Sequence, residues 1–176
     1  ALFFLIGMLY ERYHTRDMNT VGGLAAVMPV WAFFMVFFVL ASVGLPGLNG
    51  FVSEFLCLIA TFAAGGSGAY PGVLGPWFAA FAALGMVIAA MYLLMMVGKV
   101  VFGPLRQPDD HHAHDILPVD LNTREIAVLV PLAIACVVLG VAPWIATDAI
   151  AGSVTETLSA YPAAVDAARD MMVVQH

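Results

Sequence analysis

The sequence predicts an all-α fold: a polytopic bundle of transmembrane helices, one of which is discontinuous. Hydrophobic residues make up 62% of the 176 residues and charged residues 10%, whereas soluble domains carry about 25% charged residues. Several apolar runs reach the ~20 residues that a helix needs to cross a ~30 Å hydrocarbon core. Between residues 21 and 98, Glu54 is the only charged side chain, and it follows a cluster of glycine, proline and asparagine.

That cluster predicts a break in a membrane-spanning helix. Proline removes a backbone donor and glycine adopts angles that other residues resist, so the chain is expected to leave the helix at residues 44–50. Irregular backbone at membrane depth is tolerated only against other protein or beside a watery cavity. A second half-helix is expected to begin near Asn49, with Glu54 in its first turns. The residues assigned to the break are Gly44, Pro46, Gly47, Asn49 and Gly50.

Glu54 is the candidate site residue, as a proton relay. Ionisable groups inside transmembrane segments are rare and mark ion pathways, and interrupted helices mark the same kind of site. A carboxyl that is hydrogen-bonded inside a helix bundle and has only a structural role is the alternative. If residues 29–64 form one broken span, Glu54 lies about ten residues, or ~15 Å, from its outer end and close to the bilayer midplane.

The whole chain, residues 1–176, is expected to be one portion of a membrane domain. Residues 1–10 are apolar but too short to span, so we expect them to end a helix whose beginning lies outside this sequence. Spans are expected at residues 29–64 (broken at 44–50), 76–102 and 124–144, with a polar loop at 105–123 and a tail at 145–176. The loop is expected to be solvated and to bind no metal, because its His-x-His pattern lacks a fixed geometry. Its ionisable side chains are Asp109, Asp110, His111, His112, His114 and Asp115.

Charge placement selects between two models for residues 22–64. They could form two helices in a hairpin that turns at residues 44–50, or one broken span with an interfacial lead-in. With one broken span, five of the six basic residues share one side, whereas a hairpin divides them two against three. Because basic loops tend to stay in the cytoplasm, the sequence favours the broken span with these loops cytoplasmic. The five residues are Arg12, Arg16, Lys99, Arg106 and Arg124.

This topology predicts opposite accessibility for two introduced cysteines. Ser67→Cys and Gln107→Cys lie beyond the two ends of the span at residues 76–102. An impermeant maleimide should label them from opposite sides of the membrane, Gln107→Cys from the cytoplasm. Labelling of both from the same side would contradict the membrane crossing predicted at residues 76–102.

The sequence around the break resembles the antiporter-like M subunits of bacterial NADH-quinone oxidoreductase (respiratory complex I). Residues 44–55, with the sequence GLPGLNGFVSEF, are similar to the motif of that family. Other similar motifs follow in the order of the family: YER at 10–12, HTRD at 14–17, GGL at 22–24, FGP at 102–104 and DLNTRE at 120–125. The break motif alone is shared with related antiporter subunits, and the combination points to the M subunit. The resemblance extends to about Val154.

The resemblance implies the C-terminal part of a bundle of fourteen transmembrane helices, with one partial and three complete spans here. In the family, the glutamate at the position of Glu54 lies on a discontinuous helix and on the proton route towards the outer side. The implied function is proton translocation, coupled to NADH oxidation and quinone reduction by other subunits of the enzyme. The chain itself is expected to carry no redox centre and no cofactor. It has only two cysteines, Cys57 and Cys136, and no nucleotide-binding loop.

The implied partners are other membrane subunits of the respiratory complex, the lipid bilayer and protons, in the cell inner (plasma) membrane. No nucleic-acid partner is expected, because the net charge is −6. Two other functions stay open: a subunit of a multisubunit sodium/proton antiporter or membrane-bound hydrogenase on the same fold, and a structural membrane segment. The motif at residues 122–125 disfavours the first, and a carboxyl beside a helix break disfavours the second.

Overall fold

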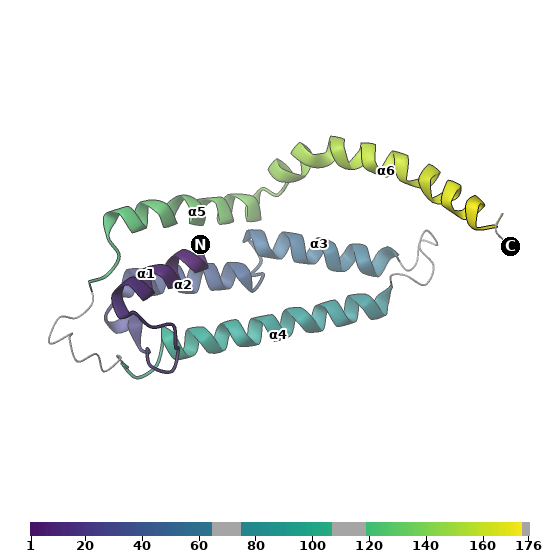
Figure 1. The fold of residues 1–176 in the computed structure, drawn as a ribbon. Coiled ribbons are helices and arrows are strands. Elements are labelled where there is room, and N and C mark those ends of the chain that lie inside the picture. The colour runs from purple at the N-terminus through teal and green to yellow at the C-terminus, as the bar shows by residue number, and fades with distance from the viewer. Residues whose placement is uncertain (65–74, 107–118, 174–176) are drawn as a thin grey trace. The chain divides into compact units, whose positions relative to one another are not determined.

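The computed structural model describes residues 1–64, 75–106 and 119–173. Regular structure in these ranges is helical, and strand pairing there is limited to one isolated antiparallel bridge between Gly22 and Arg106. The chain divides into two compact units, Ala1–Val141 and Ala142–His176. Its elements in order are α1 (Leu2–Tyr13), the short 3-10 helix η1 (Leu24–Ala26), α2 (Pro29–Ser42), α3 (Asn49–Ala64), α4 (Pro76–Val100), α5 (Thr123–Val141) and α6 (Trp144–Val173) (Figure 1).

Helices α2 and α3 are the two halves of one discontinuous helix. In Figure 1, α3 continues from the end of α2, and α4 and α5 each contact both halves. The halves have 14 and 16 residues, or ~21 and ~24 Å at 1.5 Å per residue, so neither alone crosses a ~30 Å core. Among the described helices, α4 and α5 are long and apolar enough to cross a membrane. The predicted fold class, all-α with one discontinuous helix, is confirmed.

The core of the first unit is centred on α2. Pro29 starts this helix at a position where its missing N–H is not needed. Trp31 is completely buried, and its indole N–H donates a hydrogen bond to the Leu5 carbonyl of α1 at 3.0 Å. Phe34 and Phe38, one turn apart on the buried face, stack with ring centroids 6.2 Å apart. The Trp31 hydrogen bond joins α1 to α2, and the stacked phenylalanines fill the buried face of α2.

The segment before α2 is tied to the end of α4 through the backbone. Gly22 and Arg106 exchange two hydrogen bonds, at 3.1 and 2.9 Å, and the Ala25 N–H donates to the Val101 carbonyl at 3.1 Å. Gly23 has φ +68, and a side chain there would meet the backbone of Leu105. Only glycine suits this close approach. The end of α4 is thereby held at the same end of the unit as the start of α2.

Four of the five basic residues of the topology model lie in or beside the contacts at that end. Arg106 forms the backbone bridge, Lys99 lies in the last turn of α4, and Arg12 binds Glu125, next to Arg124. The assignment of this end to the cytoplasm stays a prediction. Ser67 and Gln107, the proposed labelling positions, lie outside the described residues.

Residues 144–173 form a helix, where the sequence predicts a tail at residues 145–176. Helix α5 stops at Val141 just before Pro143, whose ring cannot continue the hydrogen-bond ladder. The Pro143 carbonyl accepts hydrogen bonds from Ala146 and Thr147, both at 3.1 Å, and so starts α6. This helix, Trp144–Val173, lies in the second unit.

Candidate functional site

Helix α2 ends in a glycine cap at the start of the break. The Val43 N–H donates to the Val39 carbonyl at 2.8 Å, and the Leu45 N–H reaches back to the Leu40 carbonyl at 3.1 Å. Between these two donors, Gly44 adopts φ +82. A left-handed glycine followed by a bond across six residues is a common way to end a helix, because it satisfies carbonyls that the helix leaves free.

The irregular stretch covers residues 43–48 and is shorter than the range predicted from the sequence. Gly47 has φ +95, and the Leu48 N–H donates to the Leu45 carbonyl at 3.1 Å to form a tight turn. Asn49 and Gly50 already lie in the first turn of α3, because the turn at Leu48 redirects the chain into the second half-helix. Pro46 lies between the two left-handed glycines, where no helical N–H is required.

The last turn of α2 and the first turn of α3 meet without a side chain between them. The Ala41 carbonyl oxygen lies against Gly50, where a methyl group would collide with it. The last carbonyls of one half-helix and the first N–H groups of the other therefore come together at the break. These are the groups that lack partners within their own helices, and they carry the opposite partial charges of the two helix ends.

Glu54 extends from α3 back to this break. Its side chain is half-buried, and its Oε2 atom occupies the space that a side chain on Gly44 would need. Within the described part of the chain, no hydrogen bond or ion pair engages the Glu54 carboxylate. The carboxylate is thus next to the backbone of the break and open to a further contact.

Gly140 on α5 completes the surroundings of the break, and sequence reasoning did not single it out. A side chain at Gly140 would collide with the Gly47 carbonyl oxygen and would lie 2.5 Å from the Cα atom of Leu48. Leu48 is buried, with 8% of its surface exposed. The available signal was a lone glycine within an apolar span, since small residues let helices approach closely.

The arrangement brings the predicted residues Gly44, Gly50 and Glu54 together, and it joins them to Gly140 of a helix far along the chain. A carboxylate can bind and release a proton, and the free backbone groups of the two helix ends can hydrogen-bond to water. The site therefore has the chemistry of a proton-exchanging group beside a polar gap in an apolar helix.

The described residues contain no group of three or more His, Cys, Asp or Glu side chains placed to bind a metal ion. The loop residues considered for metal binding, from Asp109 to Asp115, lie outside the ranges that the structure describes. Their predicted solvation stays a prediction.

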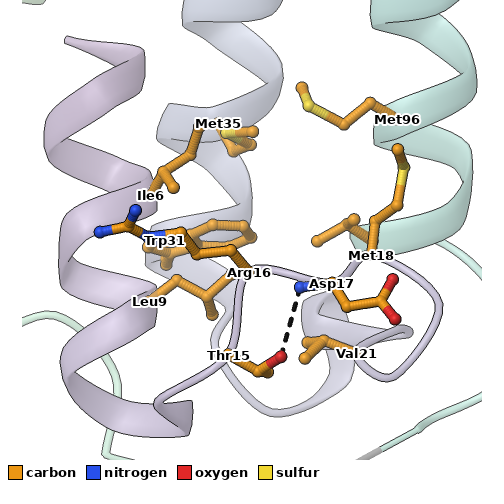
Figure 2. A pocket seen from close by; sticks show the side chains of 11 residues that line it. Ile6, Leu9, Thr15, Arg16, Asp17, Met18, Val21, Trp31, Met35 and Met96 are labelled. Carbon is orange, nitrogen blue, oxygen red and sulfur yellow. Dashed lines mark hydrogen bonds between the residues drawn. The ribbon is translucent and has the colours of Figure 1, made fainter.

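A cavity of about 140 Å³ lies at the opposite end of α2 from the break. Figure 2 shows mostly apolar side chains around it, with the loop residues Thr15, Arg16 and Asp17 at its edge. The Arg16 guanidinium lies over the ring of Tyr10 at 4.7 Å, and the Asp17 N–H donates to Thr15 Oγ1 at 3.2 Å. The Arg16 guanidinium and the Asp17 N–H thus already have partners, and the cavity is separate from Glu54.

Sequence comparisons relate the chain to membrane subunits of respiratory enzymes and antiporters. A family model described as "NADH:quinone oxidoreductase/Mrp antiporter, TM" matches residues 1–70. NADH-quinone oxidoreductase subunit M from Rhodobacter capsulatus is 38% identical over 163 residues, which cover 93% of this chain and 29% of that protein. The corresponding subunit from Pseudomonas aeruginosa is 40% identical over 153 residues, covering 87% of this chain and 27% of its own length. The chain thus spans less than a third of the length of these relatives.

Two solved structures share the fold. A chain of respiratory complex I from Thermus thermophilus matches with a TM-score of 0.63 and 33% identity, covering 79% of this chain and 26% of that chain. A chain of the Mrp complex from Dietzia sp. DQ12-45-1b also gives a TM-score of 0.63, with 19% identity, covering 82% of this chain and 32% of that chain. At that lower identity, the second match shows the fold alone.

Proposed function

We propose that the chain is part of an M-type, antiporter-like subunit of NADH-quinone oxidoreductase and forms part of a proton path across the bacterial inner membrane. The observation that carries the proposal is the position of Glu54. Its carboxylate lies against Gly44 at the break between α2 and α3, beside backbone groups that the helices leave free. A proton carrier at membrane depth needs this combination of an ionisable group and a polar gap.

Glu54 acts in this proposal as a relay. It takes a proton from one side, holds it as the neutral carboxylic acid, and releases it towards the outer side. Water at the break is hydrogen-bonded by the free carbonyls of α2 and the free N–H groups of α3, and so connects the carboxyl to the rest of the path. Gly44 leaves the room that the carboxylate needs to face this water.

The driving energy comes from elsewhere in the complex. Other subunits oxidise NADH, reduce quinone and hold the redox cofactors, while this chain supplies a translocating segment without a redox centre. Its partners in the proposal are neighbouring membrane subunits, lipid and protons. The exposed apolar surfaces of α4 and α5, which include Trp77, Phe81 and Ile134, suit contact with lipid or with neighbouring helices.

A sodium/proton antiporter subunit of the Mrp type is the second candidate, because the family model that matches residues 1–70 is described as covering both NADH:quinone oxidoreductase and the Mrp antiporter. Ion dependence separates the two functions. Inverted membrane vesicles that contain the assembled complex should acidify on NADH addition in sodium-free medium at close to the rate seen with sodium present. An absolute requirement for sodium, without any NADH-driven acidification in its absence, would favour the antiporter.

A further inference from the structure

A network at the loop end of the first unit is centred on Arg12, the last basic residue of α1. All five N–H donors of its guanidinium are used. Nη1 and Nη2 bind the two carboxylate oxygens of Glu125 at 2.9 and 2.8 Å, a bidentate pair whose side chains are 17% and 18% exposed. The remaining bonds go to the carbonyls of Val119 (2.8 Å), Met8 (2.9 Å) and Asp120 (3.3 Å). Hydrogen bonding to Glu125 raises the pKa of Arg12 above its ordinary value.

Asp120 caps the broken helix from a distant part of the sequence. Helix α2 lacks a local side-chain cap, because Met28 precedes it, and Pro29 has no N–H. The free donors of Val30 and Trp31 instead reach the Asp120 carboxylate, at 2.8 and 3.1 Å. The carboxylate thus satisfies the two N–H groups at the helix start and opposes their positive partial charge.

Glu125 joins the same network to the start of α5. It accepts the Asn122 N–H at 2.6 Å while it holds Arg12. An acidic residue that binds the N–H three positions earlier is the capping-box arrangement of a helix start. One short segment, residues 120–125, therefore binds α1, starts α5 and caps α2. We call these contacts of Arg12, Asp120 and Glu125 the clasp.

The other end of α5 touches the break. Gly140 lies fifteen positions after Glu125, or ~22 Å along a helix, and it packs on Gly47 and Leu48 without room for a side chain. Helix α5 is continuous between the two points despite Pro131 in its interior. A helix that is fixed at one end presents a fixed residue at the other. Neighbouring residues of a helix differ by ~1.5 Å along its axis and by a large rotation about it. If α5 lost its contacts at Glu125 and shifted or turned, a different part of its surface would lie against the break.

We propose that the clasp is a positioning element for the candidate proton site: it holds α2 and α5 in the register that closes Gly140 over the break beside Glu54. Arg12, Asp120 and Glu125 act through α5 and α2 and do not themselves carry protons. The functional consequence rests on the proposed function, whereas the structural coupling between clasp and break can be measured separately.

The test follows the accessibility of Leu48, which α5 covers at Gly140. Leu48→Cys is introduced into the full complex, and its rate of reaction with a maleimide is compared with and without Glu125→Gln or Arg12→Lys. Both changes disrupt the bidentate pair, and Glu125→Gln keeps the side-chain shape. Labelling should become roughly 5- to 30-fold faster, the factor that corresponds to a modest loss of local stability. The matched control is Arg124→Gln, which removes an exposed neighbouring charge and should leave the rate unchanged.

Proton pumping per NADH oxidised is measured on the same variants without the added cysteine, at equal amounts of assembled complex. We expect Glu125→Gln and Gly140→Ala to combine non-additively, since both act on one contact, whereas unconnected sites ~22 Å apart would combine independently. Unchanged labelling of Leu48→Cys in both clasp variants would overturn the inference, even if pumping fell. Independent effects on pumping would overturn the functional part. Wild-type pumping by Glu54→Gln would instead refute the proposed function and leave the labelling result standing.

Discussion

Replacing Glu54 with glutamine is expected to reduce NADH-driven proton translocation by roughly 100-fold, the lower end of what a positioned acid–base group contributes. Glutamine preserves the shape and hydrogen-bonding capacity of the side chain but cannot release a proton. Glu54→Ala should be equally damaging, and Glu54→Asp should keep part of the activity because it retains a titrating carboxyl. The measurement is vesicle acidification at equal amounts of assembled complex, together with coupled quinone reduction.

A neighbouring variant controls for disturbance of the helix itself. The Ser53 hydroxyl donates a hydrogen bond to the Gly50 carbonyl at 3.0 Å within α3. Ser53 therefore lies in the same turn as Glu54 but has no carboxyl group that could exchange a proton. Ser53→Ala should therefore pump close to the wild-type rate. If Glu54→Gln pumped as well as Ser53→Ala, the carboxyl would be structural, and the proton path would have to run elsewhere.

Gly44→Ala is expected to have the second largest effect, because it changes the site in two ways. At φ +82 a residue with a side chain is strained, at a cost of ~1–3 kcal/mol. The added methyl group would also collide with Glu54 Oε2, so the carboxylate would have to leave its position at the break. Pumping by the assembled complex should fall by at least about tenfold, in line with the contribution of a positioned acid–base group.

Gly47→Ala separates these two causes. Gly47 has a similar left-handed angle, φ +95, but a side chain there would meet no atom within 4 Å. It therefore carries the backbone strain without the collision. Native gels and the thermal stability of the complex should report comparable losses for the two variants, while Gly44→Ala should lose far more pumping per assembled complex. Equal pumping by both variants would mean that the contact between Gly44 and Glu54 does not contribute to proton pumping.

Local chemistry explains why the sequence predicted the helices and the break. The composition excludes a soluble domain. Apolar stretches such as residues 76–102 are long enough to cross a membrane as a helix. Proline and left-handed glycine act on the backbone at their own positions, so Gly44, Pro46 and Gly47 predict an interruption without any knowledge of packing. The predicted start of the second half-helix near Asn49 is confirmed, whereas the break assigned to residues 44–50 extends two residues too far, because the irregular stretch ends at Leu48.

Packing decided what surrounds the break. That the Glu54 carboxylate returns to Gly44, and that Gly140 of α5 covers Leu48, depends on how three helices are rotated about their axes. In an apolar membrane helix the hydrophobic pattern specifies little of that rotation, because lipid-facing and helix-facing surfaces are both apolar. The role of Glu54 as a proton relay stays a prediction.

The contacts of the clasp, at the other end of the first unit, also depend on packing and were not predicted from the sequence. The sequence alone determined an all-helical membrane chain with a broken helix and an acidic residue beside the break. Only the tertiary structure placed Asp120 at the start of α2, 90 residues earlier in the chain, and paired Arg12 with Glu125 across 113 positions. Helix caps and turns follow from residues within a few positions of one another, whereas a charged pair or a cap from a distant segment forms only when packing brings its partners together.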